Sequence, residues 1–193
     1  MKIAFDLDDT LCMTDEYSEY YITKFIEENN LPIKKIREIA RYSDGKYDWD
    51  FEYAKKWFKT YGDEMMLQFP SKQYAVEVIK ELRKRGHKIA IITARADDWH
   101  REPEQTSIKW LEKNDIEYDE LFFGRADKEA ICKDIDVDIF VDDDLDITEN
   151  VAKMFSGSNK KVFLMNSAWN ENFPEPEGVI RIHNLKELLE NLD

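Results

Sequence analysis

Two aspartates separated by one residue follow the first apolar stretch of the chain, in the segment IAFDLDDTL that spans residues 3–11. Residues 2–6 are typical of a short buried strand, so Asp6 is expected at its carboxyl end, where ligands bind in open α/β sheets. Asp6 and Asp8 at this spacing could share a Mg²⁺ ion, which prefers oxygen ligands. A carboxylate can also attack phosphorus and form an aspartyl-phosphate, and its neighbour could exchange a proton with the leaving oxygen. An Asp-rich turn is the structural alternative.

Polar residues follow three more predicted strands. Thr93 ends the apolar run 89–92, and a threonine hydroxyl can donate to a phosphoryl oxygen. Lys128 begins a predicted helix, where its charge opposes the helix dipole unless an anion lies nearby. Asp142 and Asp143 follow the predicted strand 137–141, and neighbouring carboxylates repel one another unless a cation lies among them. Each of these residues also has a purely structural interpretation. Thr93 could simply end a strand, Lys128 could be a solvated surface lysine, and the aspartates could lie in a solvated acidic loop.

The order of these residues along the chain, Asp-x-Asp, Thr, Lys and Asp-Asp, resembles the haloacid dehalogenase (HAD) superfamily of phosphohydrolases. The resemblance spans nearly the whole chain. It implies that Asp6 is the nucleophile and that Asp8 is the general acid and base. It also implies that Thr93 and Ala94 bind the transferring phosphoryl group and that Lys128 balances its charge. Because the dehalogenases of this superfamily lack the second aspartate, the pair resembles the phosphatase branch.

The same resemblance implies a Mg²⁺ cofactor. Asp6, Asp143 and the backbone carbonyl of Asp8 would hold the ion, and Asp142 would order a water molecule on it. Three aspartates stand in a row at 142–144, so the register of the ligands stays open by one position.

Within the superfamily, three segments are similar to the 5'-nucleotidase C-type family, which includes the 5'(3')-deoxyribonucleotidases: residues 92–95, 106–119 and 128–143. The similarity implies a small phosphorylated metabolite, a nucleoside monophosphate, as substrate. The first motif departs from this family, because Asp8-Asp9-Thr10-Leu11 stands where the deoxyribonucleotidases have an Asp-Gly-Val-Leu type. Another phosphorylated metabolite therefore stays open as the substrate. So do a phosphotransferase, a receiver-like phospho-accepting module and a non-catalytic binding protein.

Alternating strand and helix patterns predict an α/β fold, a Rossmann-like parallel sheet flanked by helices. Residues 14–70 differ, because helices are expected at 14–30, around the isoleucines of 33–39 and at 49–61, with a stop at Gly62. We therefore expect a small helical cap at 14–70, inserted into a core of residues 1–13 and 71–193. Ser71 is expected to cap the next helix. Aromatic residues at helical spacing in the cap are typical of a packed core rather than of base stacking.

Several residues near these motifs could contact a substrate. Arg95 and Arg101 follow Thr93, although a solvated side chain is the simpler interpretation of Arg101. Arg41 or Lys46 of the cap could reach the distal end of a substrate. The segment 166–178, rich in Asn, Glu and Pro, could form a flap.

Composition narrows the classes of function. The chain has 193 residues, 42% of them hydrophobic, which suits one globular domain with an insertion. Its net charge of −14 argues against binding to nucleic acid polymers or to an anionic membrane. Two cysteines are too few for a disulfide framework or a zinc site. With neither a signal peptide nor an apolar span of about 20 residues, we expect a cytoplasmic protein. The aromatic-rich cap leaves a homodimer open.

Overall fold

A six-stranded parallel sheet confirms the predicted α/β fold class. The computed structural model describes residues 1–97, 100–124 and 127–192. Among them the strand order is β3-β2-β1-β4-β5-β6, and every neighbouring pair is parallel. The strands are β1 (Lys2–Phe5), β2 (Lys88–Ile92), β3 (Glu120–Phe122), β4 (Ile139–Asp142), β5 (Lys161–Met165) and β6 (Val179–Ile182).

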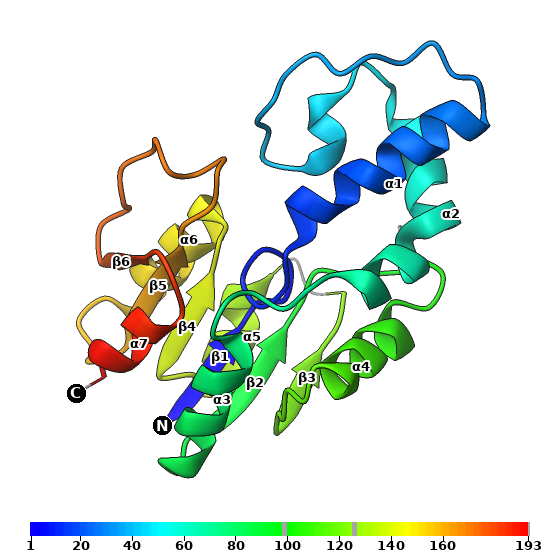
Figure 1. Ribbon diagram of the computed structural model, residues 1–193. Coiled ribbons are helices and arrows are strands. Elements are labelled where there is room, and N and C mark those ends of the chain that lie inside the picture. The colour runs from blue at the N-terminus through cyan, green and yellow to red at the C-terminus, as the bar shows by residue number, and fades with distance from the viewer. Residues whose placement is uncertain (98–99, 125–126, 193) are drawn as a thin grey trace.

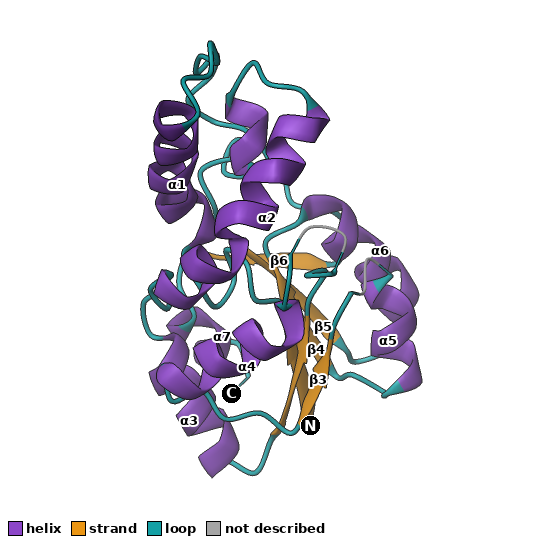
Figure 2. Cartoon of the chain, turned by 90° about the vertical axis from the view of Figure 1, so that its right-hand side faces the viewer, coloured by secondary structure: helices purple, strands orange, loops and turns teal. Residues whose placement is uncertain are grey.

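Helices cover both faces of the sheet, as Figure 2 shows. They are α3 (Ala75–Lys84), α4 (Pro103–Lys113), α5 (Lys128–Asp134), α6 (Leu145–Phe155) and α7 (Lys186–Glu190). Ile3 and Phe5 of β1 share a buried cluster with side chains of α3, α4 and α7. Ala4, which points to the opposite face, shares a second cluster with side chains of α5 and α6. The continuous apolar run of β1 therefore reflects burial on both sides.

A helical segment stands above the carboxyl ends of the strands (Figure 1). It contains α1 (Thr14–Glu28), the 3₁₀ turn η1 (Ser43–Lys46) and α2 (Phe51–Gln68). Trp57 is fully buried there and its ring contacts those of Trp49 and Phe58, while Tyr61 meets Phe25 edge-on. These rings pack against one another. We keep the division into a core (1–13 and 71–193) and an inserted cap (14–70) as a proposal, and "cap" denotes residues 14–70 below.

The predicted helix around 33–39 is wrong. This segment is extended and pairs with residues 46–48. The Ile36 amide donates to the Lys46 carbonyl at 2.8 Å, and the Asp48 amide donates to the Lys34 carbonyl at 2.9 Å. Ile36 is exposed, so the isoleucine spacing reflects no buried helical face, and the neighbouring segment supplies the backbone partners instead.

Three other features differ from expectation. Ser71 does not cap α3. It forms a β-bridge with Cys12, and α3 begins only after Tyr74, whose φ is 69°. Gly62 does not stop α2, which continues to Gln68. Strand β6 was not expected, because its four residues show no continuous apolar run.

Gly62 allows α2 to approach the loop that follows β2. A Cβ atom on Gly62 would lie 2.8 Å from Nδ1 of His100, whose side chain is buried. We expect Gly62→Ala to lower the free energy of unfolding by about 1–2 kcal/mol, because overpacking outweighs the gain in helix propensity. Urea denaturation measures this. In a His100→Ala background the same substitution should cost less, and an equal cost in both backgrounds would contradict the contact.

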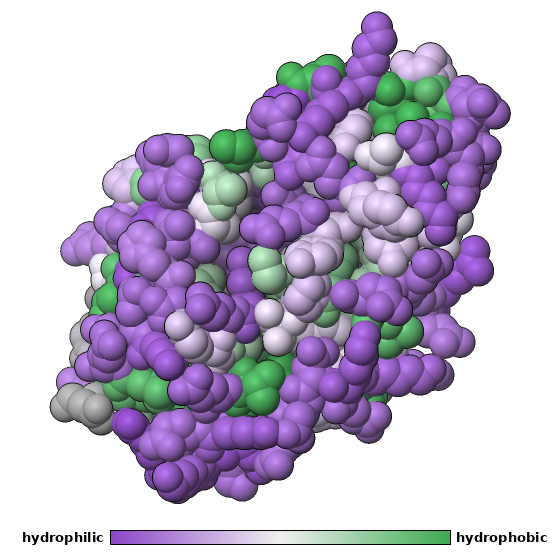
Figure 3. All heavy atoms as spheres, in the orientation of Figure 1, coloured by the Kyte–Doolittle hydropathy of each residue, from purple (hydrophilic) through white to green (hydrophobic). Residues whose placement is uncertain are grey.

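The surface is polar on the face drawn in Figure 3, where apolar residues occur in small groups. Across the residues described, no helix is both long and apolar enough to cross a membrane. Cys12 and Cys132 are buried free thiols.

Candidate active site

The carboxyl ends of β1 and β4 bring three of the predicted aspartates together. Phe5 and Val141 are paired in register, and the Asp6 amide donates to the Val141 carbonyl at 3.0 Å. The residues that follow on both strands therefore meet at one edge of the sheet. Asp6, Asp142 and Asp143 offer carboxylate oxygens that all lie within 4.8 Å of one another.

Lys128 supplies the counter-charge of this cluster. Its Nζ donates to Asp6 Oδ1 at 2.5 Å and to Asp142 Oδ2 at 2.7 Å, and all three side chains are buried. Burial opposes the charge on Lys128, but the two carboxylates outweigh burial and raise the pKa of the lysine above its usual range. Lys128 begins α5, and these carboxylates are the anions that offset its unfavourable place at a helix N-terminus.

One lysine does not balance three carboxylates. Burial and the charges of Asp142, Asp9 and Asp6 raise the pKa of Asp143 well above its usual range. Burial raises the pKa of Asp6 as well, to about 7, although Lys128 opposes the shift. Such a set of oxygen donors with excess negative charge fits Mg²⁺. Asp6 and Asp143 would hold the ion, together with the backbone carbonyl of Asp8.

Asp144 has a different, structural role. Its side chain caps α6 by accepting from the amides of Asp146 and Ile147. It is also paired with Arg41 of the cap, whose Nη2 lies 2.6 Å from Asp144 Oδ1. Of the three consecutive aspartates, Asp142 and Asp143 therefore lie beside Asp6, whereas Asp144 is the N-cap residue of α6.

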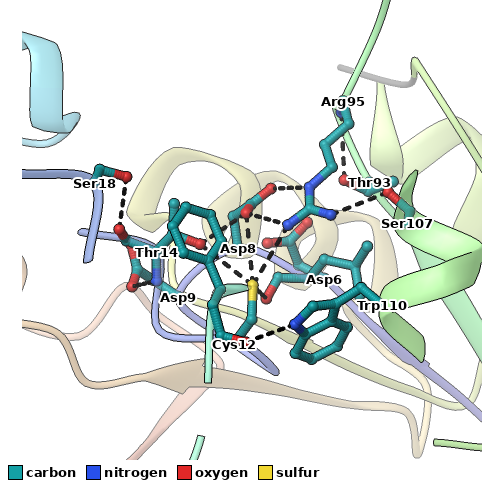
Figure 4. A network of polar contacts seen from close by, with 12 residues as sticks. Asp6, Asp8, Asp9, Cys12, Thr14, Ser18, Thr93, Arg95, Ser107 and Trp110 are labelled. Carbon is teal, nitrogen blue, oxygen red and sulfur yellow. Dashed lines mark hydrogen bonds and ion pairs between the residues drawn. The ribbon is translucent and has the colours of Figure 1, made fainter. Parts of the chain in front are cut away.

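Asp8 is held by a network of its own (Figure 4). Arg95, just beyond the end of β2, donates from Nε to Asp8 Oδ2 at 2.8 Å and from Nη2 to Oδ1 at 2.6 Å. Thr14, the first residue of α1, donates its hydroxyl to Oδ1 at 2.7 Å. The Cys12 thiol lies 3.6 Å from the same oxygen. The network therefore connects the loop after β1 to the loop after β2 and to the first turn of the cap.

The pairing with Arg95 decides the ionisation of Asp8. Burial raises the pKa of Asp8, but the charge and hydrogen bonds of Arg95, with the bond from Thr14, outweigh it and lower the pKa below its usual range. A two-pronged guanidinium–carboxylate pair is the strong geometry for such a contact. In the substrate-free protein Asp8 is therefore an ionised carboxylate, which suits a proton acceptor.

Thr93 and Ala94 lie at the end of β2, the strand next to β1. Thr93 is fully buried, and its Oγ1 accepts from the Arg95 amide at 3.3 Å. Ala94 is exposed. The structure places both residues at the sheet edge that carries Asp6, and their role in binding a phosphoryl group stays a prediction.

Sequence reasoning missed what the cations near the site contact. Arg95, one of the residues that could contact a substrate, is only 4% exposed and pairs with Asp8. Arg41 pairs with Asp144 across the cap and core, and Lys46 is buried against Asp15 within the cap. In so acidic a chain, an arginine at the end of a buried strand indicates that it pairs with a carboxylate of the protein itself. The sequence does not identify that carboxylate, because Asp8 lies 87 positions away from Arg95.

Removing the charge of Asp143 tests the metal interpretation. We expect Asp143→Asn to raise the free energy of unfolding by about 1 kcal/mol in chelator, because one of three crowded carboxylates is gone. We expect the same variant to lose the rise in melting temperature that Mg²⁺ gives the wild-type protein, because a ligand bound only by the folded state stabilises it. Scanning fluorimetry with and without Mg²⁺ measures both. A melting temperature that responds equally to Mg²⁺ in both proteins would contradict the assignment.

Known proteins resemble this chain over nearly its whole length. No family model matches it. A Bacillus cereus protein named "Putative nucleotidase" is 28% identical over 189 residues, which cover 91% of this chain and 92% of that protein. A "Putative Phosphatase" structure from Clostridium difficile matches with a TM-score of 0.72 at 17% identity, covering 100% of this chain and 98% of that one. A HAD hydrolase structure from Bacillus subtilis, bound to magnesium, matches with a TM-score of 0.62 at 15% identity, again covering 100% and 98%.

Each of these matches includes both the cap and the core. At such identities the structural likeness concerns the fold, and it agrees with the resemblance carried by the four motifs. The chain therefore has the fold of the HAD superfamily of hydrolases.

Proposed function

We propose that this protein is a Mg²⁺-dependent phosphomonoesterase that works through an aspartyl-phosphate on Asp6. The observation that carries the proposal is the meeting of Asp6, Asp142 and Asp143 around Lys128 at one edge of the sheet, with Asp8 two residues along the chain. Phosphoryl transfer is catalysed mainly by positioning and charge stabilisation, and buried, mutually paired charges provide both. The likeness to HAD hydrolases supports the phosphatase class.

The proposed reaction has two steps. In the first, the ionised Asp8 takes the proton of a phosphomonoester monoanion, an Asp6 oxygen bonds to phosphorus, the bond from phosphorus to the leaving oxygen breaks, and that proton passes from Asp8 to the leaving oxygen. In the second, Asp8 takes a proton from water, whose oxygen bonds to phosphorus and releases phosphate from Asp6. Lys128 offsets the negative charge of the phosphoryl oxygens. Mg²⁺, when held by Asp6, Asp143 and the Asp8 carbonyl, supplies further positive charge at the same oxygens.

We further propose that the substrate is a nucleoside monophosphate. The segments similar to the 5'-nucleotidase C-type family support this, as does the name of the Bacillus cereus relative. The competing proposal is another small phosphorylated metabolite. The cap rings of Phe25, Trp57 and Tyr61 are buried among one another and offer no face to a base, whereas Tyr17, Tyr20 and Tyr53 are exposed rather than part of the packed core.

Phosphate release from a panel of substrates tests the proposal. The panel contains nucleoside monophosphates, sugar phosphates and 4-nitrophenyl phosphate, each with Mg²⁺ and each with chelator. We expect Mg²⁺-dependent release, fastest from a nucleoside monophosphate. Faster release from a sugar phosphate would contradict the substrate class alone. Intact substrates throughout, despite bound Mg²⁺, would contradict the phosphatase and favour the non-catalytic alternative.

A further inference from the structure

Asn170 ties the loop after β5 to the loop after β4. The residue is fully buried, and its Nδ2 donates to the backbone carbonyls of Asp143 and Met165, both at 2.9 Å. Its Oδ1 accepts from the Ser167 amide at 3.0 Å and from Arg181 Nη1 at 2.8 Å. A side-chain amide has two donor hydrogens and two acceptor sites, so all four are used and only one orientation of the amide satisfies them. The side chain is therefore placed to hold the protein's own backbone.

Arg181 of β6 fixes this amide from the other side. Its side chain is only 9% exposed. Besides the bond to Asn170, Nη1 donates to the side-chain oxygen of Asn166 at 3.0 Å, and Nη2 donates to the Phe173 carbonyl at 2.7 Å. The segment 166–178, drawn in orange in Figure 1, is thus fastened to the edge strand of the sheet. These bonds favour a support for the neighbouring loop over a flap.

The peptide bond between Asp143 and Asp144 is held by side chains at both of its polar atoms. Its carbonyl accepts from Asn170, and its N–H donates to Asp142 Oδ1 at 2.9 Å. Rotation of this peptide plane would break both hydrogen bonds. Because β4 ends at Asp142 and fixes the chain on the other side of Asp143, a fixed peptide leaves the Asp143 backbone one position, from which its carboxylate lies beside Asp6.

Asp143 needs such a restraint more than the other two carboxylates of the cluster. It is less buried than Asp6 and Asp142, and it lies in the loop between β4 and α6 rather than in a strand. A ligand in a free loop loses conformational entropy when it binds a cation, and this loss weakens binding. Asn170 removes that freedom before the cation arrives.

We propose that Asn170 is a positioning residue that holds the peptide between Asp143 and Asp144 and so places Asp143 for Mg²⁺. The inference rests on the proposed phosphomonoesterase function and extends its Mg²⁺ site to a residue 27 positions from Asp143. Asn170 acts through the backbone of a ligand and is not itself a ligand. Its loss should therefore reduce the affinity for Mg²⁺ rather than the rate at saturating Mg²⁺.

Isothermal titration calorimetry of the whole protein with MgCl₂ tests the proposal. Asn170→Ala removes the donor to the Asp143 carbonyl and adds no charge near the cluster. We expect its Kd for Mg²⁺ to be about tenfold weaker than that of the wild type, or more, as is typical when the partner of a metal ligand is lost. Phosphate release should show the same shift in the Mg²⁺ concentration that gives half the maximal rate, with kcat at saturating Mg²⁺ close to that of the wild type.

Asn166→Ala is the matched control, because Asn166 lies in the same loop and accepts from the same arginine nitrogen, but its side chain bonds Arg181 rather than Asp143. Its Kd for Mg²⁺ should equal that of the wild type. Urea denaturation in chelator measures any damage to the fold separately from Mg²⁺ binding. Should Asn170→Ala fail to fold, Asn170→Ser carries the test, because its hydroxyl ends one bond short of the Asp143 carbonyl and the variant keeps a polar group in the buried loop.

An unchanged Kd in the Asn170 variant would overturn the positioning role. So would an equal weakening in Asn166→Ala, because general damage to the loop would then explain the effect. A wild-type protein that binds no Mg²⁺ would overturn the metal dependence of the proposed function, and this inference with it. Intact substrates despite bound Mg²⁺ would overturn the phosphatase alone, and the comparison of Kd values would still decide the role of Asn170.

Discussion

Asp6→Asn is expected to reduce phosphate release by about 10⁴-fold or more, the scale seen when an enzyme loses its nucleophile. The amide cannot form the aspartyl-phosphate, and it also replaces the charged partner of Lys128, whose Nζ lies 2.5 Å from Asp6 Oδ1. Steady-state phosphate release from the best substrate of the panel measures the loss. Mass spectrometry of acid-quenched wild-type protein should find one phosphoryl group on the peptide that contains Asp6.

Asp9→Asn is the matched control for this substitution. Asp9 lies three residues further along and accepts from the amides of Thr14 and Asp15. Its φ of 53° is left-handed, a conformation that asparagine tolerates well. The amide oxygen of asparagine can still accept these bonds, so activity should stay close to that of the wild type. Comparable rates for Asp6→Asn and wild type, or a phosphoryl group on another residue, would contradict the assignment of the nucleophile.

The sequence predicts the sheet well because its information is local. Strands such as β2 and β5 are continuous apolar runs bounded by polar residues, and both appear at the expected positions. Parallel packing then brings the ends of β1 and β4 to one edge, where Asp6 and Asp142 meet as the family resemblance implies. Strand β6 escaped prediction because it lies at the edge of the sheet and one of its residues is exposed.

The sequence does not predict which carboxylate each arginine pairs with when the two residues are far apart along the chain. Arg95 could pair with any of several aspartates, and only the fold selects Asp8 over Asp6 or Asp9. Likewise, nothing local distinguishes Asp144 from Asp143. The distinction comes from the start of α6 and from Arg41, which lies 103 positions away and reaches across from the cap. In a chain with a net charge of −14, candidate partners for each cation are plentiful, so pairing is set by topology.

Lys128→Met is expected to lower the free energy of unfolding by about 3–5 kcal/mol in chelator at neutral pH, because it leaves buried carboxylates without their cation. Asp6 and Asp142 are 5% and 1% exposed, so water cannot replace the lysine. The loss should depend on pH. Burial already raises the pKa of Asp6 to about 7, well above the usual range of an aspartate, and removal of Lys128 raises it further. The folded variant then binds more protons than the unfolded chain, and its stability falls as pH rises through this range.

Urea denaturation of Lys128→Met at pH 5 and pH 8 therefore measures both the size and the sign of the effect, with the larger deficit expected at pH 8. Lys160→Met is the matched control, since Lys160 pairs with Asp136 at 2.6 Å but that aspartate is 88% exposed. Loss of such a surface pair should cost less than about 1 kcal/mol at either pH. Equal costs for the two substitutions would show that Lys128 does not hold the charge balance of the cluster, and the electrostatic basis of the proposed site would fail with it.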